Sequence, residues 1–153
     1  MMRALLPVFA IAVMTTGCGG YGNRLEGSIS QSFSLDFDHN DIRKQDASLI
    51  VEYTKTNGKT VNKVAKMVFD TSNLNGLGKN SKVDGQLFKD RVVVQRAAAT
   101  GGDFPAVQNG DLEFGNFDFK DNGTISGSFN VGFDNGFTLY GEFNGTCSVV
   151  NTD

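Results

Sequence analysis

One histidine and two cysteines are the residues in this 153-residue chain whose side chains most often do chemistry. His39 lies in the run Asp36-Phe37-Asp38-His39-Asn40-Asp41, where carboxylates flank its imidazole. A Ser-His-Asp triad is recognised by its geometry and not by its spacing, but no segment resembles the strained turn that presents a nucleophilic serine. We therefore expect His39 to be an exposed residue at a turn between strands, and the protein to be no enzyme.

The same run begins like a calcium-binding loop. Asp36, Asp38 and Asn40 stand at alternate positions and offer the hard oxygen ligands that Ca²⁺ takes. The pattern then stops, because Asp41 stands where the sharp turn needs Gly, and Ala47 stands where a bidentate Glu should complete the shell. We expect no bound metal and no cofactor, and these three residues are only weak metal-site candidates.

Cys18 ends a segment typical of export signals. Arg3 supplies a positive start, and Ala4 to Met14 form an uncharged apolar run. That run is shorter than the ~20 residues a membrane-spanning helix needs. The sequence predicts a signal peptide over residues 1–17, a tether over 18–25 that carries Cys18, and a single domain over 26–153.

The stretch Thr15-Thr16-Gly17-Cys18 resembles the lipobox of bacterial lipoproteins, although Thr15 stands where that family usually has Leu. The resemblance implies that the Cys18 sulfur carries diacylglycerol, with acyl groups such as palmitate, and that the signal is cut between Gly17 and Cys18. Gly19 stands where an Asp would imply retention in the inner membrane. The resemblance therefore implies an anchor in the outer membrane, or in the cell membrane of a host with only one. The alternative is an ordinary cleavage site, with Cys18 free to pair with a second cysteine.

Cys147 is that second cysteine. It lies in phase with Phe143 and Val149 on an alternating segment, which predicts that its side chain points into the core. If lipid occupies the Cys18 sulfur, no disulfide between the two cysteines is possible. We then expect Cys147 to be a buried, unreactive thiol.

The C-terminal part predicts three antiparallel strands in a row. Apolar residues alternate with polar ones, so that one face of each strand is buried. The turn runs Asp121-Asn122-Gly123 and Asp134-Asn135-Gly136 separate the strands, and a bulge at Gly115 restores the phase of the first strand. The predicted strands are Asp111 to Lys120, Thr124 to Phe133 and Phe137 to Val150.

The first half shows the same alternation less regularly. Apolar residues alternate over Ile29 to Phe37, Leu49 to Tyr53, Val61 to Phe69 and Val83 to Gln95. Asn57-Gly58 predicts a hairpin turn, whereas 73–82 and 97–110 are predicted to be loops. Simple alternation places Lys63 and Lys66 on opposite faces of one strand. The fold expected is all-β, an antiparallel meander of about seven or eight strands that forms a small barrel or a two-sheet sandwich.

Charge excludes one class of partner. The net charge is −3, which argues against nucleic-acid binding because phosphate recognition needs a basic surface. From Arg24 to Arg96 there are 12 Lys and Arg against 9 Asp and Glu, whereas from Ala97 onward Lys120 stands against 8 acids. The two halves therefore attract each other if they pack together.

Two functions remain open. The first is a membrane-anchored envelope lipoprotein with a non-catalytic structural or interaction role, whose partner is another envelope protein. The alternative is a lipocalin-like barrel that binds a small hydrophobic ligand. The inward aromatic residues distinguish the two, because tight packing favours the first function and an open cavity of about 300 Å³ or more favours the second. These residues are Phe33, Phe37, Phe117, Phe129, Phe133 and Phe143.

Overall fold

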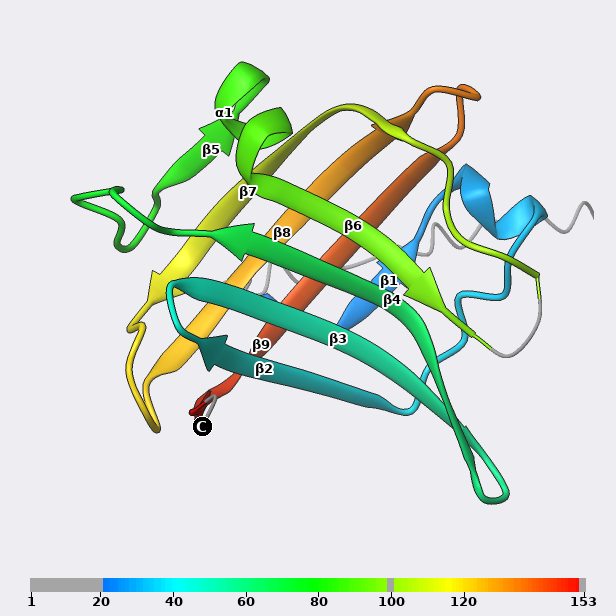
Figure 1. The fold of residues 1–153 in the computed structure, drawn as a ribbon, viewed down its shortest axis with the longest axis horizontal. Coiled ribbons are helices and arrows are strands. Elements are labelled where there is room, and N and C mark those ends of the chain that lie inside the picture. The colour runs from blue at the N-terminus through cyan, green and yellow to red at the C-terminus, as the bar shows by residue number, and fades with distance from the viewer. Residues whose placement is uncertain (1–20, 99–100, 152–153) are drawn as a thin grey trace, which may run out of the picture.

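The computed structural model describes residues 21–98 and 101–151, which form one strongly curled sheet shaped like half of a barrel (Figure 1). The strand order is β5-β7-β8-β9-β2-β3-β4-β6, and β1 pairs with one end of β9. The fold is all-β, as predicted. The predicted signal segment and Cys18 lie outside the described residues.

The C-terminal strands form the layer at the back of Figure 1. They are β7 (Val107–Phe117), β8 (Thr124–Phe133) and β9 (Thr138–Val150). Each pairs antiparallel with the next, and the register shifts between Phe114 and Asn116, which confirms the predicted bulge at Gly115. The left-handed residues of the two turns are Asn122 and Gly136, with φ of 58° and 85°. In the first turn this residue is Asn122 and not the neighbouring Gly123.

The front layer is built from the first half of the chain. It contains β2 (His39–Gln45), β3 (Ser48–Asn57), β4 (Thr60–Asp70) and β6 (Val92–Ala97). β3 and β4 form the hairpin predicted at Asn57-Gly58. β2 runs parallel to the end of β9, and the Ser148 hydroxyl donates to the Ile42 carbonyl across this junction at 3.4 Å. The sheet is therefore mixed and not a purely antiparallel meander.

The strand predicted from Ile29 to Phe37 is wrong. Ser28–Gln31 form a 3₁₀ turn, η1, and the chain is irregular from Phe33 to Phe37. Ile29 and Phe33 are four residues apart, so the turn places both against the core, and the Phe33 amide donates to the Ile29 carbonyl at 3.1 Å. The apolar residues are inward as expected, but a turn and a loop place them there. A short strand that was not predicted, β1 (Arg24–Glu26), precedes them.

The strand predicted from Val83 to Gln95 is also wrong, because a helix divides it. β5 (Lys82–Asp84) leads into α1 (Gly85–Arg91), and β6 begins at Val92. The helix is 7 residues long and buries only Phe88, whose ring lies against Gly110 of β7. The valines on either side stay in strands β5 and β6, and the helix between them buries the Phe88 ring.

Aromatic rings fill the space between the two layers. Tyr53 of β3 lies between Phe37 and Phe129, with ring centroids 5.0 and 6.3 Å away. Two further groups complete the core: Phe104 contacts Phe33 and Phe133, and Phe114 contacts Phe69, Phe117 and Phe143. Phe129, Phe133 and Phe143 are fully buried, whereas Phe33, Phe37 and Phe117 are partly buried against the core. The six inward residues singled out from the sequence therefore pack together.

Two glycines of β8 and β9 make room for these rings. Gly127 pairs with Phe143, and Phe129 pairs with Gly141, so each ring stands opposite a glycine on the neighbouring strand. A Cβ atom on Gly141 would overlap the Phe129 ring. These two glycines thus permit close approach of an aromatic side chain.

Candidate functional site

The residues around His39 take separate partners, apart from one Asp38 oxygen that lies 3.9 Å from His39 Nε2. Asp36 forms an ion pair with Lys55 at 2.9 Å, and an Asp38 oxygen accepts the Thr56 amide at 3.0 Å. His39 is exposed, as predicted, but it begins β2 opposite Thr54 and does not lie in a turn. Asn40 pairs with the inward-facing Tyr53. Within residues 21–98 and 101–151, no three His, Cys, Asp or Glu side chains come together as a metal site would require.

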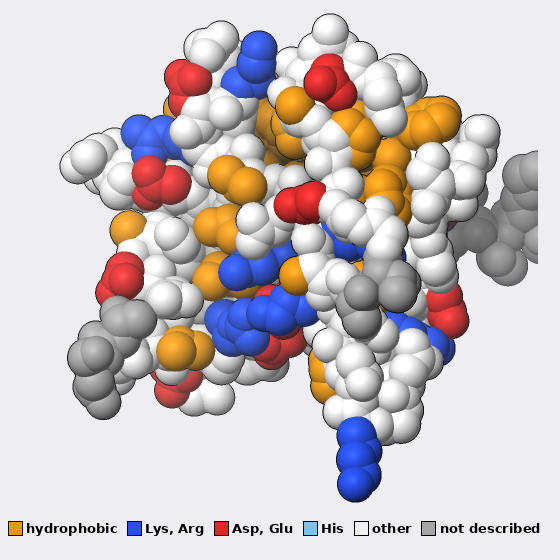
Figure 2. Space-filling view, turned by 45° about the vertical axis from the view of Figure 1, so that its right-hand side comes forward, with side chains coloured by type: hydrophobic (Ala, Val, Ile, Leu, Met, Phe, Trp, Pro, Cys, Tyr) orange, Lys and Arg blue, Asp and Glu red, His pale blue; other side chains and the backbone are white. Residues whose placement is uncertain are grey.

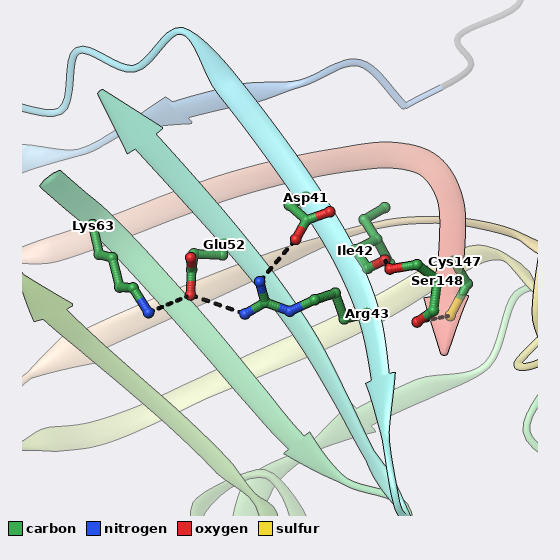
Figure 3. Close-up of polar contacts among 7 residues, drawn as sticks. All are labelled: Asp41, Ile42, Arg43, Glu52, Lys63, Cys147 and Ser148. Atoms are coloured by element: carbon green, nitrogen blue, oxygen red, sulfur yellow. Dashed lines mark hydrogen bonds and ion pairs between the residues drawn. The ribbon is translucent and has the colours of Figure 1, made fainter. Parts of the chain in front are cut away.

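Cys147 is a fully buried free thiol in β9, which confirms the predicted core position. Its Sγ lies 3.8 Å from the Ser148 carbonyl oxygen (Figure 3). Burial raises the pKa of this thiol, because the thiolate would lose its hydration.

Glu52 is the one buried charged residue among those described, at 5% exposure, and it lies on the outward side of β3. Its Oε2 is 3.2 Å from Arg43 Nη2 and 3.2 Å from Lys63 Nζ. Arg43 also bonds Asp41 through Nη1 at 2.9 Å, so four charged side chains from β2, β3 and β4 form one row (Figure 3). A buried carboxylate needs such partners, since removing them leaves a charge without hydration.

A bulge in β4 brings two lysines to this same outward side. The register shifts between Tyr53 and Thr54, so that Lys63 pairs with Thr54 and Lys66 pairs with Glu52. The prediction that Lys63 and Lys66 lie on opposite faces is therefore wrong, because one extra residue in β4 reverses the alternation between them.

Beside the charged row lies an apolar row across β3, β4 and β6. Ile50, Val68 and Val93 are cross-strand neighbours on β3, β4 and β6, and their exposure rises from 4% at Ile50 to 54% at Val93. Figure 2 shows a line of hydrophobic side chains next to a group of Lys and Arg side chains. We call this surface the Glu52 face; its members are Asp41, Arg43, Ile50, Glu52, Lys63, Lys66, Val68 and Val93. Sequence reasoning missed it, although a carboxylate between Val51 and Tyr53 was a usable signal.

The N-terminal residues that the structure describes are bound to the back layer, which lies across the core from the Glu52 face. Arg24 of β1 forms an ion pair with Glu142 of β9 at 2.9 Å, and the Tyr140 hydroxyl donates to the same carboxylate at 2.6 Å. The Gly22 amide donates to it at 3.3 Å. The Tyr140 hydrogen bond, assisted by the Gly22 amide and Arg24, lowers the pKa of Glu142. The Asn144 amide bonds the Asn23 side chain at 2.8 Å.

Tyr21 extends this attachment across the outside of the sheet. Its ring lies on Gly115 of β7, where a Cβ atom would overlap it, and its hydroxyl interacts with Ser128 of β8. Burial and the nearby Glu113 raise the pKa of Tyr21. From Tyr21 to Arg24 the chain therefore passes from β7 and β8 to β9. We call residues 21–26 with these contacts the N-terminal clamp; five of the six had been assigned to the tether.

The two described hollows are polar and lie outside the aromatic core. One, of about 210 Å³, is lined by Ser34, Asp36, Lys55, Asn57, Asn62, Val64, Arg96 and Ala98. The other, of about 240 Å³, lies on β7, β8 and β9 near Gly132. Neither is lined by a phenylalanine.

Comparison with protein-family models, with curated proteins and with solved structures gave no match. Among residues 21–98 and 101–151, no helix is long and apolar enough to cross a membrane.

Proposed function

We propose that the mature chain is an envelope lipoprotein, anchored through lipid on Cys18, whose β domain has a non-catalytic role performed at its surface. The observation that carries the second part is the contrast between the two sides of the front layer. Its inner side is filled by aromatic rings, whereas its outer side carries the Glu52 face.

The anchor rests on the sequence at the Gly17-Cys18 junction. Only Gly19 and Gly20 stand between Cys18 and Tyr21, which packs on the sheet. A protein made in this way has its folded domain attached directly beside the acyl chains. Each buried methylene of those chains contributes about 0.8 kcal/mol, so two or more chains give a stable attachment.

The surface role rests on the composition of the Glu52 face. The apolar row ends in the exposed Val93 and lies beside arginine and lysine, so that apolar contacts can supply affinity and charges can supply orientation. Val93 is 54% exposed on a strand that has a neighbour on one side only. The envelope partner that this surface fits carries a carboxylate opposite Lys66.

Fractionation of cells that express the full chain tests the anchor. We expect the protein in the outer-membrane fraction after a high-salt wash, and we expect Cys18→Ala to release it. Cys147→Ala is the matched control, since Cys147 is buried and its loss should leave the anchor intact. Release of the unchanged protein by salt would contradict the proposal.

Site-specific photo-crosslinking in the same cells tests the surface role. A photoreactive residue at Val93 should give a discrete cross-linked species that Lys66→Glu removes. The control position is Val61, which is 59% exposed near the tip of the β3–β4 hairpin. Equal products at both positions would contradict a role for the Glu52 face. Strong thermal stabilisation of the domain by a long-chain fatty acid would instead favour the hydrophobic-ligand alternative.

A further inference from the structure

The N-terminal clamp lies on one face of the domain, and this position has a consequence for an anchored protein. Tyr21 contacts Gly115 of β7, and Gly22 contacts Glu142 of β9. Both contacts are on the outward side of the back layer. Tyr21, the first residue that the structure describes, therefore lies on this outward face.

The distance from there to the lipid is short. Cys18 is three residues before Tyr21, and three residues span at most about 11 Å when fully extended. A domain of this size has a radius of gyration of about 14 Å. A link shorter than that radius cannot bring the opposite side of the domain to the bilayer while the clamp holds.

The two outward faces point in opposite directions, because the two layers pack through their inner sides (Figure 1). β8 carries only uncharged residues outward beside Tyr21: Thr124, Ser126, Ser128 and Asn130. On β9 the Glu142 carboxylate is matched by Arg24. A polar surface of this kind, with tyrosines at its centre, suits the headgroup layer of a membrane.

We infer that the outward face of β7, β8 and β9 lies against lipid headgroups, and that the Glu52 face is directed away from the membrane. This inference rests on the proposed lipid anchor at Cys18. The occupant of the β7–β9 face is a layer of zwitterionic headgroups, since Asp111 and Glu113 on β7 oppose close approach to an anionic surface.

Single-tryptophan reporters test this orientation cleanly, because the chain has no tryptophan. One variant carries Asn130→Trp on exposed β8, and the matched variant carries Val93→Trp on β6. Each protein, purified from membranes with its lipid, is reconstituted into phosphatidylcholine vesicles in which some headgroups bear a nitroxide quencher. We expect several-fold stronger quenching at position 130 than at 93. Equal quenching, or stronger quenching at 93, would overturn the inference.

A second pair of variants tests whether the short link between Cys18 and Tyr21 causes this orientation. A long Gly-Ser insertion between Gly20 and Tyr21 lengthens the link without changing the anchor or the domain, so it should remove the difference between the two reporters. A difference that survives the insertion would show that the short link does not set the orientation.

Failure of the proposed lipid anchor can be told apart from failure of the inferred orientation. If cells leave Cys18 unmodified, the proposed function fails. The same thiol is then coupled to a maleimide-bearing phospholipid, which is selective because Cys147 is buried. The two reporters still measure which face meets the headgroups.

Discussion

The pairing of Phe129 with Gly141 gives the most specific prediction about stability. The ring of Phe129 occupies the space where a Cβ atom of residue 141 would lie, and the closest contacts of that atom are all with this ring. Phe129→Ala should destabilise the domain by about 3–5 kcal/mol through the lost burial and the cavity left behind. Gly141→Ala should destabilise it by about 1–3 kcal/mol, because the methyl group collides with the ring.

The two changes together should be far from additive. Without the ring, the methyl group at 141 enters vacated space and partly fills it. The double variant should therefore be more stable than the sum of the single effects predicts, by about 1–3 kcal/mol. The matched control is Gly127 with Phe143: a Cβ atom there overlaps the Glu113 carbonyl oxygen as well as approaching the Phe143 ring. Removal of the ring leaves that backbone clash in place. In this second double-mutant cycle, the double variant should therefore be little more stable than the sum of the two single effects predicts.

Urea unfolding followed by far-ultraviolet circular dichroism measures both cycles on a chain that starts at Gly19. The free energies of unfolding of the wild type and of the single and double variants give the two coupling energies. Additivity within about 0.5 kcal/mol for Phe129 and Gly141 would refute the packing described. Equal coupling energies in both cycles would refute the distinction between a clash with a side-chain ring at Gly141 and a clash with the backbone at Gly127.

Three further predictions concern charged and titratable groups. Glu52→Ala should lower the free energy of unfolding by about 1–3 kcal/mol, because Arg43 and Lys63 lose their shared acceptor; an unchanged urea midpoint would contradict this. The Cys147 thiol should be alkylated much more slowly in the folded chain than in urea, since it is buried and its pKa is raised; equal rates would contradict the burial. The folded-state pKa of Glu142 lies below 4.5, so its stabilising contribution is present above about pH 4.5 and is lost as the pH falls through the lowered value. Glu142→Gln should therefore destabilise the domain at about pH 7 and have a smaller effect at about pH 3, and a larger effect in acid would show that the sign is wrong.

The C-terminal strands were predictable because their information is local. Alternation with period two and two Asn- and Gly-bearing turns identify β8 and β9 almost to the residue. The bulge at Gly115 follows from a phase change within one strand, and the burial of Cys147 follows from its phase with Phe143. Each of these features depends on neighbours in the sequence.

The first half was harder because distant contacts decide its structure. Ile29 reaches the core from a 3₁₀ turn and Phe88 from a short helix, and either side chain would also suit a strand. β1 has a single inward residue, Leu25, and forms only because β9 offers it an edge. The parallel contact of β2 with β9 joins residues about a hundred positions apart, which no local pattern reports.

The Glu52 face and the N-terminal clamp could not be predicted from the sequence, because each combines residues that are distant in the chain. The Glu52 face combines side chains of four strands, and a bulge near Val64 turns Lys63 outward. The N-terminal clamp places Tyr21 on Gly115, a pair separated by most of the chain. The sequence identified Gly115 as a bulge, but only the three-dimensional arrangement shows that it also seats an aromatic ring.

Intact mass spectrometry of the protein extracted from membranes tests the central claim most directly. The account predicts a mature chain that begins at Cys18, carries the mass of diacylglycerol, and is absent from cells that express Cys18→Ala. An unmodified mature chain, or one with a disulfide between Cys18 and Cys147, would contradict the lipid anchor.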